Sequence, residues 1–288
     1  MTIQLGIIGF PIGHSLSPVF QQAALDHLKL DAIYSTWEID PGDLGSFIDG
    51  LRSPDIQGIN VTVPHKEAVL PLLDHVDEWA LQAGAVNTIV NRGGALYGYN
   101  TDGIGFIKGL RHNAPFELQN KTVLIIGAGG SARGVVRALA NEYVGNIIIA
   151  NRTLSRAQSL STLSIGLGVP AQAISLDWQE LSIAAVQSEL IVNCTSVGMA
   201  HTSEFGLSPL LLQQISPNSV VYDLVYNPIE TQLLKEAVRA GAAVISGIKM
   251  LVYQGAASFE LWFDRPAPVD VMLESADKAI QNMAESPD

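Results

Sequence analysis

The sequence predicts an α/β protein of two domains. Its 288 residues are long for one compact domain and sufficient for two. Strand and helix patterns alternate through residues 1–100, which predicts a mixed α/β unit. Residues 121–153 then read as a buried strand, a glycine-rich turn, a helix and a second strand. This order is typical of a doubly wound sheet that binds a dinucleotide, which we expect in the second domain.

The elements of the first domain follow from apolar runs and their boundaries. The strands are expected at residues 5–9, 32–39 and 58–62, and the helices at residues 17–28, 42–51 and 65–73. Pro18 suits the first turn of a helix because proline lacks the N–H that this turn leaves unpaired. Two further apolar runs, 85–91 and 95–99, flank Gly93-Gly94 and predict a β-hairpin.

A glycine-rich turn opens the second domain. Residues 123–126 form a short apolar run suited to a strand buried on both faces. Gly127 permits a tight turn, and Gly129 lets the backbone approach a pyrophosphate without a Cβ in the way. Ala132 occupies the place of a frequent third glycine and is small enough for close helix packing. The following helix would direct free N–H groups at phosphates, as in a Rossmann-type domain.

The end of the next strand indicates which dinucleotide binds. An NAD site usually has Asp or Glu about 20 residues after the glycines, where it bonds the ribose 2′-hydroxyl. Here that place falls on Asn151, followed by Arg152 and, one turn later, Arg156. A neutral residue beside two guanidinium groups suits a 2′-phosphate, so the sequence predicts NADP. For Arg156, a solvated helix arginine is an equally good interpretation.

The rest of the chain completes both domains. Further strands are expected at residues 190–193, 219–223 and 243–246. Residues 248–262 predict an apolar helix that packs back on the first domain. We therefore assign residues 1–102, completed by C-terminal helices in 248–288, to substrate binding and catalysis, and residues 103–247 to the Rossmann-type NADP-binding domain.

The composition excludes several classes of function. A net charge of −12 argues against nucleic acid and against anionic membrane surfaces. The one cysteine, Cys194, excludes an internal disulfide and suits a reducing compartment. The N-terminus does not read as a signal peptide, no apolar run approaches the length of a membrane span, and the six histidines lack metal-ligand spacing. We expect a cytoplasmic protein, monomer or homodimer, that uses no metal and acts on a small molecule.

Two polar segments of the first domain follow strand ends. Pro64 stops one strand and places Lys66 near the start of the helix expected at 65–73, where the helix dipole disfavours a cation and favours release of its proton. Asp102 would act in the opposite direction. Lys66 and Asp102 form a candidate acid–base pair if the fold brings them together; a solvated surface lysine is the alternative.

Together these segments resemble shikimate dehydrogenases, the NADP-dependent oxidoreductases of aromatic amino-acid biosynthesis. The matching motifs are ordered along nearly the whole chain: residues 13–18 (GHSLSP), 60–66 (NVTVPHK), 83–88 (AGAVNT), 98–102 (GYNTD), the glycine turn, 151–153 (NRT) and 247–254 (GIKMLVYQ). The resemblance implies reversible NADPH-dependent reduction of 3-dehydroshikimate to shikimate, on the pathway to chorismate and aromatic amino acids.

The resemblance also implies a role for individual residues. Lys66 would be the general acid and base, paired with Asp102. Ser15 and Ser17 would hold the substrate carboxylate, although Ser17 taken alone is slightly better explained as a helix N-cap. The other substrate residues would be Asn60, Thr62, Asn87, Tyr226 and Gln254. The cofactor residues would be Glu78, Gly127, Ala128, Gly129, Gly130, Ser131, Asn151, Arg152, Thr153, Arg156, Leu224, Gly247 and Met250.

Two alternatives remain beside this interpretation, and a third is set aside. A quinate/shikimate dehydrogenase with relaxed substrate or cofactor use has the same fold. A non-catalytic NADP sensor would have lost Lys66 or Asp102, and both are present. The glycine turn with residues 151–153 also resembles part of glutamyl-tRNA reductase, but this chain has no cysteine early in its sequence. Cys194 stands where alanine is frequent in the family, and we interpret it as structural.

Overall fold

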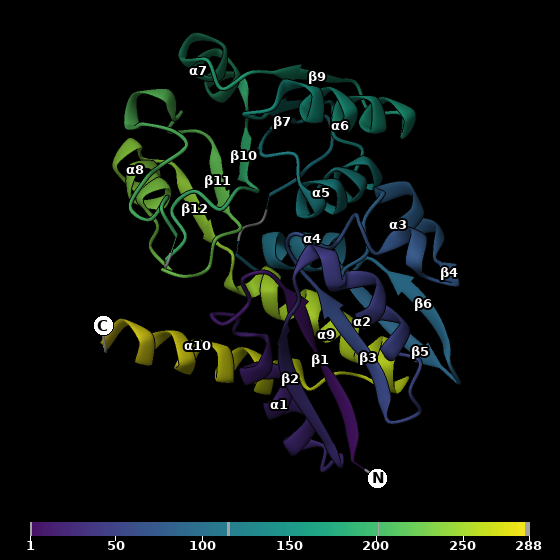
Figure 1. The fold of residues 1–288 in the computed structure, drawn as a ribbon. Helices are drawn as coiled ribbons and strands as arrows, with labels where there is room; N and C mark the ends of the chain where they lie inside the picture. The colour runs from purple at the N-terminus through teal and green to yellow at the C-terminus, as the bar shows by residue number, and fades with distance from the viewer. Residues whose placement is uncertain (1, 114–115, 201, 286–288) are drawn as a thin grey trace. The chain divides into compact units, whose positions relative to one another are not determined.

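The computed structural model describes residues 2–113, 116–200 and 202–285. The chain divides into two compact units (Figure 1). The first unit consists of Met1–Gly105 and Leu251–Asp288, and the second unit is Phe106–Met250. The two unit boundaries fall inside helices α4 (Asp102–Asn113) and α9 (Ile248–Phe263).

Within the described residues, the first unit holds a six-stranded mixed sheet of order β2-β1-β3-β5-β6-β4. Its strands are β1 (Ile3–Gly9), β2 (Ala32–Glu38), β3 (Ile56–Val61), β4 (His75–Val76), β5 (Thr88–Arg92) and β6 (Ala95–Tyr99). The pairs β1–β2 and β1–β3 are parallel, whereas β3–β5 and β5–β6 are antiparallel. The predicted hairpin is confirmed as β5–β6, although its first strand begins at Thr88 rather than at residue 85.

The helices of the first unit lie largely where the sequence predicts them. They are α1 (Ser17–His27), α2 (Leu44–Gly50) after the 3₁₀ turn η1 (Pro41–Asp43), α3 (Glu78–Ala83), α9 and α10 (Val269–Glu285), with a second 3₁₀ turn η2 (Leu70–Leu72). The helix expected at 65–73 is wrong: the chain forms turns there and then η2. Pro71 explains the difference, because it has no N–H for the carbonyl of Glu67 and its ring would clash with that carbonyl in an α-helix.

Helix α9 packs on the sheet of the first unit. The indole N–H of Trp262 donates to the carbonyl of Ile89 at 3.0 Å, and Gln57 Nε2 donates to the carbonyl of Trp262 at 2.7 Å. Gly58 makes room for this contact, since a Cβ at that position would lie 2.5 Å from the indole nitrogen. The prediction that the C-terminal helix returns to the first domain is confirmed.

In the described part of the second unit, six parallel strands follow the order β12-β11-β10-β7-β8-β9. They are β7 (Thr122–Ile126), β8 (Asn146–Ala150), β9 (Ala171–Ile174), β10 (Leu190–Asn193), β11 (Val220–Asp223) and β12 (Ala243–Ser246). Numbered from β7, this is the 3-2-1-4-5-6 order of the doubly wound dinucleotide-binding fold. The predicted Rossmann-type domain is therefore present.

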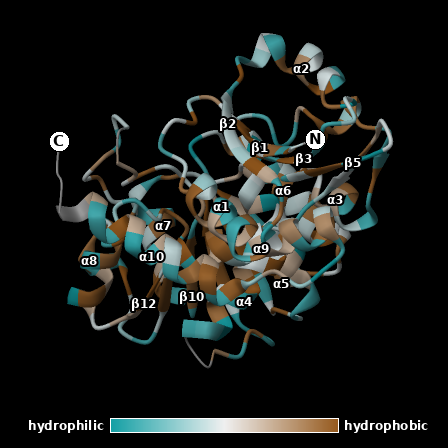
Figure 2. Ribbon diagram, turned by 90° about the horizontal axis from the view of Figure 1, so that it is seen from below, coloured by the Kyte–Doolittle hydropathy of each residue, from teal (hydrophilic) through white to brown (hydrophobic). Residues whose placement is uncertain are grey.

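Apolar side chains on both faces hold this second sheet. Val123 and Ile125 belong to one core cluster, and Leu124 and Ile126 belong to another. The helices that supply the covering residues are α5 (Gly130–Asn141) and α6 (Leu154–Gly166) for the first cluster, and α7 (Trp178–Gln187) and α8 (Gln232–Ala240) for the second. Figure 2 shows strand β10, whose residues are all buried, in the colour of apolar residues, as expected for a strand covered on both faces.

Candidate active site

Lys66 and Asp102 meet in the first unit. Lys66 lies on the turn that follows β3, and Asp102 is the first residue of α4. The Lys66 Nζ lies 2.6 Å from Asp102 Oδ2, and the two side chains are only 10% and 4% exposed. Lys66 is therefore not a solvated surface lysine. The pair is buried and hydrogen-bonded, as a general acid–base pair can be.

The electrostatic setting of this pair differs from the one predicted. Because no α-helix begins at Lys66, the argument from a helix dipole at the lysine is wrong. The helix terminus instead belongs to Asp102, in the first turn of α4, where a negative charge is favourable. The turn of Lys66 is held by its own carbonyl, which accepts from the backbone N–H of Val86 at 2.8 Å.

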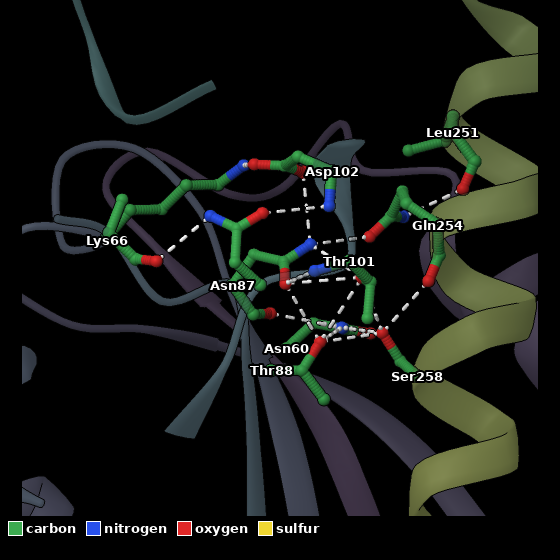
Figure 3. Close-up of polar contacts among 11 residues, drawn as sticks. Asn60, Lys66, Asn87, Thr88, Thr101, Asp102, Leu251, Gln254 and Ser258 are labelled. Atoms are coloured by element: carbon green, nitrogen blue, oxygen red, sulfur yellow. Dashed lines mark hydrogen bonds and ion pairs between the residues drawn. The ribbon is translucent and has the colours of Figure 1, made fainter. Parts of the chain in front are cut away.

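Asn87 connects the pair to α9 (Figure 3). Its Oδ1 accepts from the backbone N–H of Thr101 at 2.8 Å. Because a backbone N–H can only donate, this bond fixes the orientation of the Asn87 amide. Its Nδ2 donates to Asp102 Oδ1 at 3.0 Å and to Gln254 Oε1 at 3.1 Å. Gln254 is oriented in turn, since its Nε2 donates to the carbonyl of Leu251 at 2.7 Å. Four of the predicted site residues thus form one hydrogen-bonded group.

Asn60 lies behind this group and is buried. Its Oδ1 accepts from the hydroxyl of Tyr34 at 2.7 Å, and its Nδ2 donates to Ser258 Oγ at 2.9 Å and to the carbonyl of Asn87 at 3.2 Å. Both ends of the amide are engaged with the protein. Asn60 therefore supports this group through bonds at both ends of its amide, as Asn87 does, and its contact with substrate or lysine stays a prediction.

The network also contains residues that the sequence did not single out. Ser258 Oγ lies 2.7 Å from Thr88 Oγ1, and Thr88 Oγ1 donates to Asn87 Oδ1 at 3.0 Å. Burial raises the pKa of Tyr34 well above its usual value, although a hydrogen bond with Ser17 opposes the shift, so Tyr34 is neutral here. Ser258 follows Gln254 by four residues, and this helical spacing is the signal that would have found it.

Thr62 directly follows β3, Ser15 lies in the loop between β1 and α1, and Ser17 begins α1. The backbone N–H of Thr62 donates to the carbonyl of Ile8 at 2.9 Å. The interpretation of Ser17 as an N-cap is wrong: α1 begins at Ser17 itself, and Leu16 occupies the cap position. Ser15 Oγ accepts from the backbone N–H of Ser17 at 3.2 Å, so Ser15 supports the start of the helix.

The glycine turn of the second unit has the geometry that a pyrophosphate needs. Gly127 has φ +107°, a conformation that favours glycine, and the space where Gly129 would carry a Cβ is open. Helix α5 starts at Gly130, and its cap residue Gly129 has no side chain to occupy the first N–H groups. These features fit the phosphates of a dinucleotide. Ala128 is buried and Ser131 is the second residue of α5.

The segment after β8 carries the predicted ribose contacts. Asn151 Nδ2 donates to the carbonyl of Thr153 at 2.9 Å, which shapes the turn before α6. Arg152 is exposed, Arg156 lies in the first turn of α6, and residues 151–156 include no acidic side chain. Both guanidinium groups lie on the segment that follows the second strand of the dinucleotide motif.

The remaining predicted cofactor residues are divided between the units. Gly247 packs on Leu224, since a Cβ on Gly247 would lie 2.3 Å from the Leu224 carbonyl oxygen, and Met250 belongs to the same apolar cluster. Tyr226 follows Leu224 in the loop after β11 of the second unit. Glu78 begins α3 of the first unit, is exposed and accepts from Gln82 Nε2 at 3.0 Å.

The described residues show neither a metal site nor a helix that could span a membrane. Across residues 2–113, 116–200 and 202–285, no group of three or more His, Cys, Asp or Glu side chains has the geometry to hold a metal ion. In the same part of the chain, no helix combines the length and apolar character needed to cross a bilayer.

Known proteins match this chain along most of its length. Family models described as "Shikimate dehydrogenase substrate binding domain", "Shikimate / quinate 5-dehydrogenase" and "Shikimate 5'-dehydrogenase C-terminal domain" match residues 7–89, 110–207 and 247–276. A curated shikimate dehydrogenase (NADP(+)) of Geobacillus kaustophilus is 42% identical over 276 residues, covering 96% of this chain and 98% of the relative. The chain belongs to the shikimate dehydrogenase family.

Solved structures agree with this family assignment. The shikimate 5-dehydrogenase of Thermus thermophilus, in complex with NADP(H) and shikimate, superposes with a TM-score of 0.85 at 34% identity and covers 96% of this chain and 99% of its own. A quinate dehydrogenase of Corynebacterium glutamicum in complex with NAD gives a TM-score of 0.86 at 30% identity, with coverage of 96% and 99%. The solved structures similar to this chain thus include both a shikimate and a quinate dehydrogenase, one in complex with NADP(H) and the other with NAD.

Proposed function

We propose that this protein catalyses the reversible NADPH-dependent reduction of 3-dehydroshikimate to shikimate in aromatic amino-acid biosynthesis. The supporting observation is the buried Lys66–Asp102 pair with its ordered amides, in a member of the shikimate dehydrogenase family. Residues 1–102 and 248–288 bind the substrate and carry the catalytic pair, and residues 103–247 bind NADP.

Proton transfer is the task of Lys66. NADPH, when bound, supplies the hydride that reduces the ring ketone. Lys66 gives its proton to the forming alkoxide, and its positive charge stabilises the oxyanion that develops on the way. Asp102 holds the ammonium group at 2.6 Å and fixes its direction. In the oxidation of shikimate, neutral Lys66 accepts the hydroxyl proton.

Neutral polar side chains select a hydroxylated ring. Ser15 and Ser17 bind the carboxylate, and Thr62, Asn87, Gln254 and Tyr226 bind ring hydroxyls, while Asn60 supports Asn87. The fixed orientation of the Asn87 and Gln254 amides favours this assignment, because a site with preset donors and acceptors rejects analogues that lack the matching hydroxyls. The serine pair suits the unadorned carboxylate carbon of shikimate better than that of quinate, which carries an additional hydroxyl.

The second unit provides the preference for NADP over NAD. Residues Gly127 to Ser131 hold the pyrophosphate, and Asn151, Arg152, Thr153 and Arg156 hold the 2′-phosphate. Leu224, Gly247 and Met250 flank the nicotinamide, and Glu78 is a further cofactor-binding residue. The absence of acidic side chains from residues 151–156 supports this choice.

The cellular setting is part of the proposal. A single cysteine and a biosynthetic activity suit the cytoplasm, and a net charge of −12 does not suit nucleic acid as a partner. The protein acts as a monomer or homodimer, which light scattering of the purified protein would decide.

Initial rates of NADP⁺ reduction with shikimate, measured beside quinate and beside NAD⁺, test the proposal. Activity confined to shikimate and NADP⁺ is expected. Efficient turnover of quinate or use of NAD⁺ would keep the catalytic pair and overturn the assigned specificity. Binding of NADPH without turnover of 3-dehydroshikimate would instead identify a sensor.

A further inference from the structure

A buried carboxylate joins three segments at the carboxyl ends of the strands in the second unit. Asp223 is the last residue of β11 and is fully buried. Its Oδ1 accepts from Asn193 Nδ2 at 2.9 Å and from the backbone N–H of Val225 at 3.0 Å. Its Oδ2 accepts from the Thr231 hydroxyl at 2.6 Å. One side chain thus connects the end of β10, the loop after β11 and the start of α8.

Each donor is directed at Asp223 by its other bonds. Thr231 Oγ1 caps α8 by accepting from the backbone N–H of Leu234 at 3.2 Å, so its one hydroxyl hydrogen is available for Asp223. Asn193 Oδ1 accepts from the backbone N–H of Thr195 at 3.0 Å and from its hydroxyl at 2.6 Å, so the Asn193 NH₂ group must face Asp223. A carboxylate fits these converging donors because it only accepts.

The joined segments border the proposed cofactor site. Residues 194–198, the β10 loop, lie against the glycine turn: the N–H of Cys194 donates to the carbonyl of Ile126 at 2.8 Å, and a Cβ on Gly127 would lie 3.0 Å from Thr195 Cγ2. Residues 224–231, the β11 loop, contain Leu224, on which Gly247 packs. Asp223 therefore links the pyrophosphate end of the site to its nicotinamide end.

We propose that Asp223 is a positioning residue for NADP binding, which sets the β10 loop and the β11 loop at a fixed separation through Asn193 and Thr231. This inference rests on the proposed function, since it assigns the two loops to the cofactor. Burial of a carboxylate among neutral donors is costly, and burial raises the pKa of Asp223 to about 6 against the opposing effect of its hydrogen bonds. We infer that the fixed placement of the two loops offsets this cost of burying the carboxylate.

The test compares Thr231→Val with Thr231→Ser in the full-length protein. Valine removes the hydroxyl and keeps the shape, whereas serine keeps the hydroxyl. We expect Thr231→Val to weaken NADPH binding about tenfold, the effect of losing one hydrogen bond to a charged group, and Thr231→Ser to bind within about twofold of the wild type. Fluorescence titration with NADPH measures both, and hydrogen exchange at the amides of Val197 and Val225 reports on the two loops.

A matched control separates positioning from general loss of stability. Ser164→Ala, in α6, removes another buried hydrogen bond of the second unit. In it, Ser164 Oγ donates to the carbonyl of Val169 at 3.1 Å. This variant should have a lower melting temperature than the wild type and should bind NADPH with wild-type affinity. Wild-type NADPH affinity and unchanged exchange in Thr231→Val would overturn the role of Asp223. Absence of NADPH binding by the wild type would instead overturn the proposed function, and with it the cofactor assignment of the loops.

Discussion

The two units each bury an aspartate at a place where function is expected, and they treat it differently. In the first unit, Asp102 faces the ammonium group of Lys66 at 2.6 Å and the start of a helix. In the second unit, Asp223 receives bonds from the neutral donors Asn193, Val225 and Thr231. A carboxylate paired with a cation can orient that cation for proton transfer. A carboxylate held by neutral donors can only orient backbone and side-chain donors.

The environment of an aspartate, rather than its burial, therefore separates a chemical from a positioning role. Removing the partner of Asp102 should therefore change the rate of reaction. Removing the charge of Asp223 should change cofactor binding and the pH dependence of stability.

Lys66→Ala removes the proton donor of the first unit. We expect kcat to fall by about three orders of magnitude or more with little change in the KM for shikimate, because the lost interaction is made mainly in the transition state. Steady-state kinetics with NADP⁺ measure both parameters. Lys121→Ala, which removes a half-exposed lysine paired with Glu189, is the control and should behave as the wild type. A near-normal rate in Lys66→Ala would refute the proposed acid and base.

Asp102→Asn keeps the size of the side chain and removes its charge. Its new NH₂ group must face either Lys66 or the NH₂ group of Asn87, both of which are donors, so one bond of the site is lost whichever way the amide turns. We expect kcat to fall about a hundredfold. Asp74→Asn, at a surface carboxylate paired with Arg52, is the matched control. Equal rates in the two variants would remove Asp102 from the mechanism.

Arg152→Ala tests the cofactor side of the comparison. We expect the KM for NADPH to rise about tenfold or more, because a charge-assisted bond to the 2′-phosphate is lost, while the KM for NADH stays the same. The ratio of the two KM values is the measurement, and NADH is its internal reference. Arg239→Ala, at a surface arginine paired with Glu236, should leave the ratio unchanged. A parallel change in both KM values would refute the assigned 2′-phosphate contact.

The sequence predicted best what short segments determine. The glycine turn at Gly127, the strands on either side and the hairpin at Gly93 each depend on residues close together in the chain, and the structure confirms them. The prediction of a helix at 65–73 is wrong because it followed the apolar pattern, whereas Pro71 blocks an α-helix there. The N-cap at Ser17 failed because the helix begins one residue earlier than a cap there would allow.

The site itself depends on contacts between distant residues. Lys66 and Asp102 are 36 residues apart, and Asn87 and Gln254 are 167 apart, so the motifs named them but could not place them. The motif that names Asn60 also does not show that its amide is bonded at both ends, to Tyr34 and to Ser258. Asp223 drew no prediction, since its partner Asn193 is 30 residues away and no motif joins the two.

Asp223→Asn gives the smallest effect and addresses the second aspartate directly. Burial raises the pKa of Asp223 to about 6 in the folded protein, above the usual value of about 3.9 for an unfolded chain. A raised pKa means that the protonated form contributes stability at low pH, fully below about pH 4, and that this contribution is lost as the pH rises through about 6. The loss corresponds to about 3 kcal/mol, which asparagine does not suffer because it does not ionise.

The difference in melting temperature between Asp223→Asn and the wild type should therefore shift in favour of the variant between about pH 4.5 and 7, the range over which Asp223 titrates. Above about pH 8 this difference should stay constant. Other titrating groups are common to both proteins and cancel in the difference. Over the same range, NADPH binding by the variant should stay weaker than that of the wild type, because its amide cannot accept from Thr231 and from Asn193 at once. A difference in melting temperature that is independent of pH would mean that Asp223 is ionised at every pH tested, held so by its three donors. That outcome would move Asp223 closer to Asp102 and narrow the contrast between the two units to the presence of the lysine.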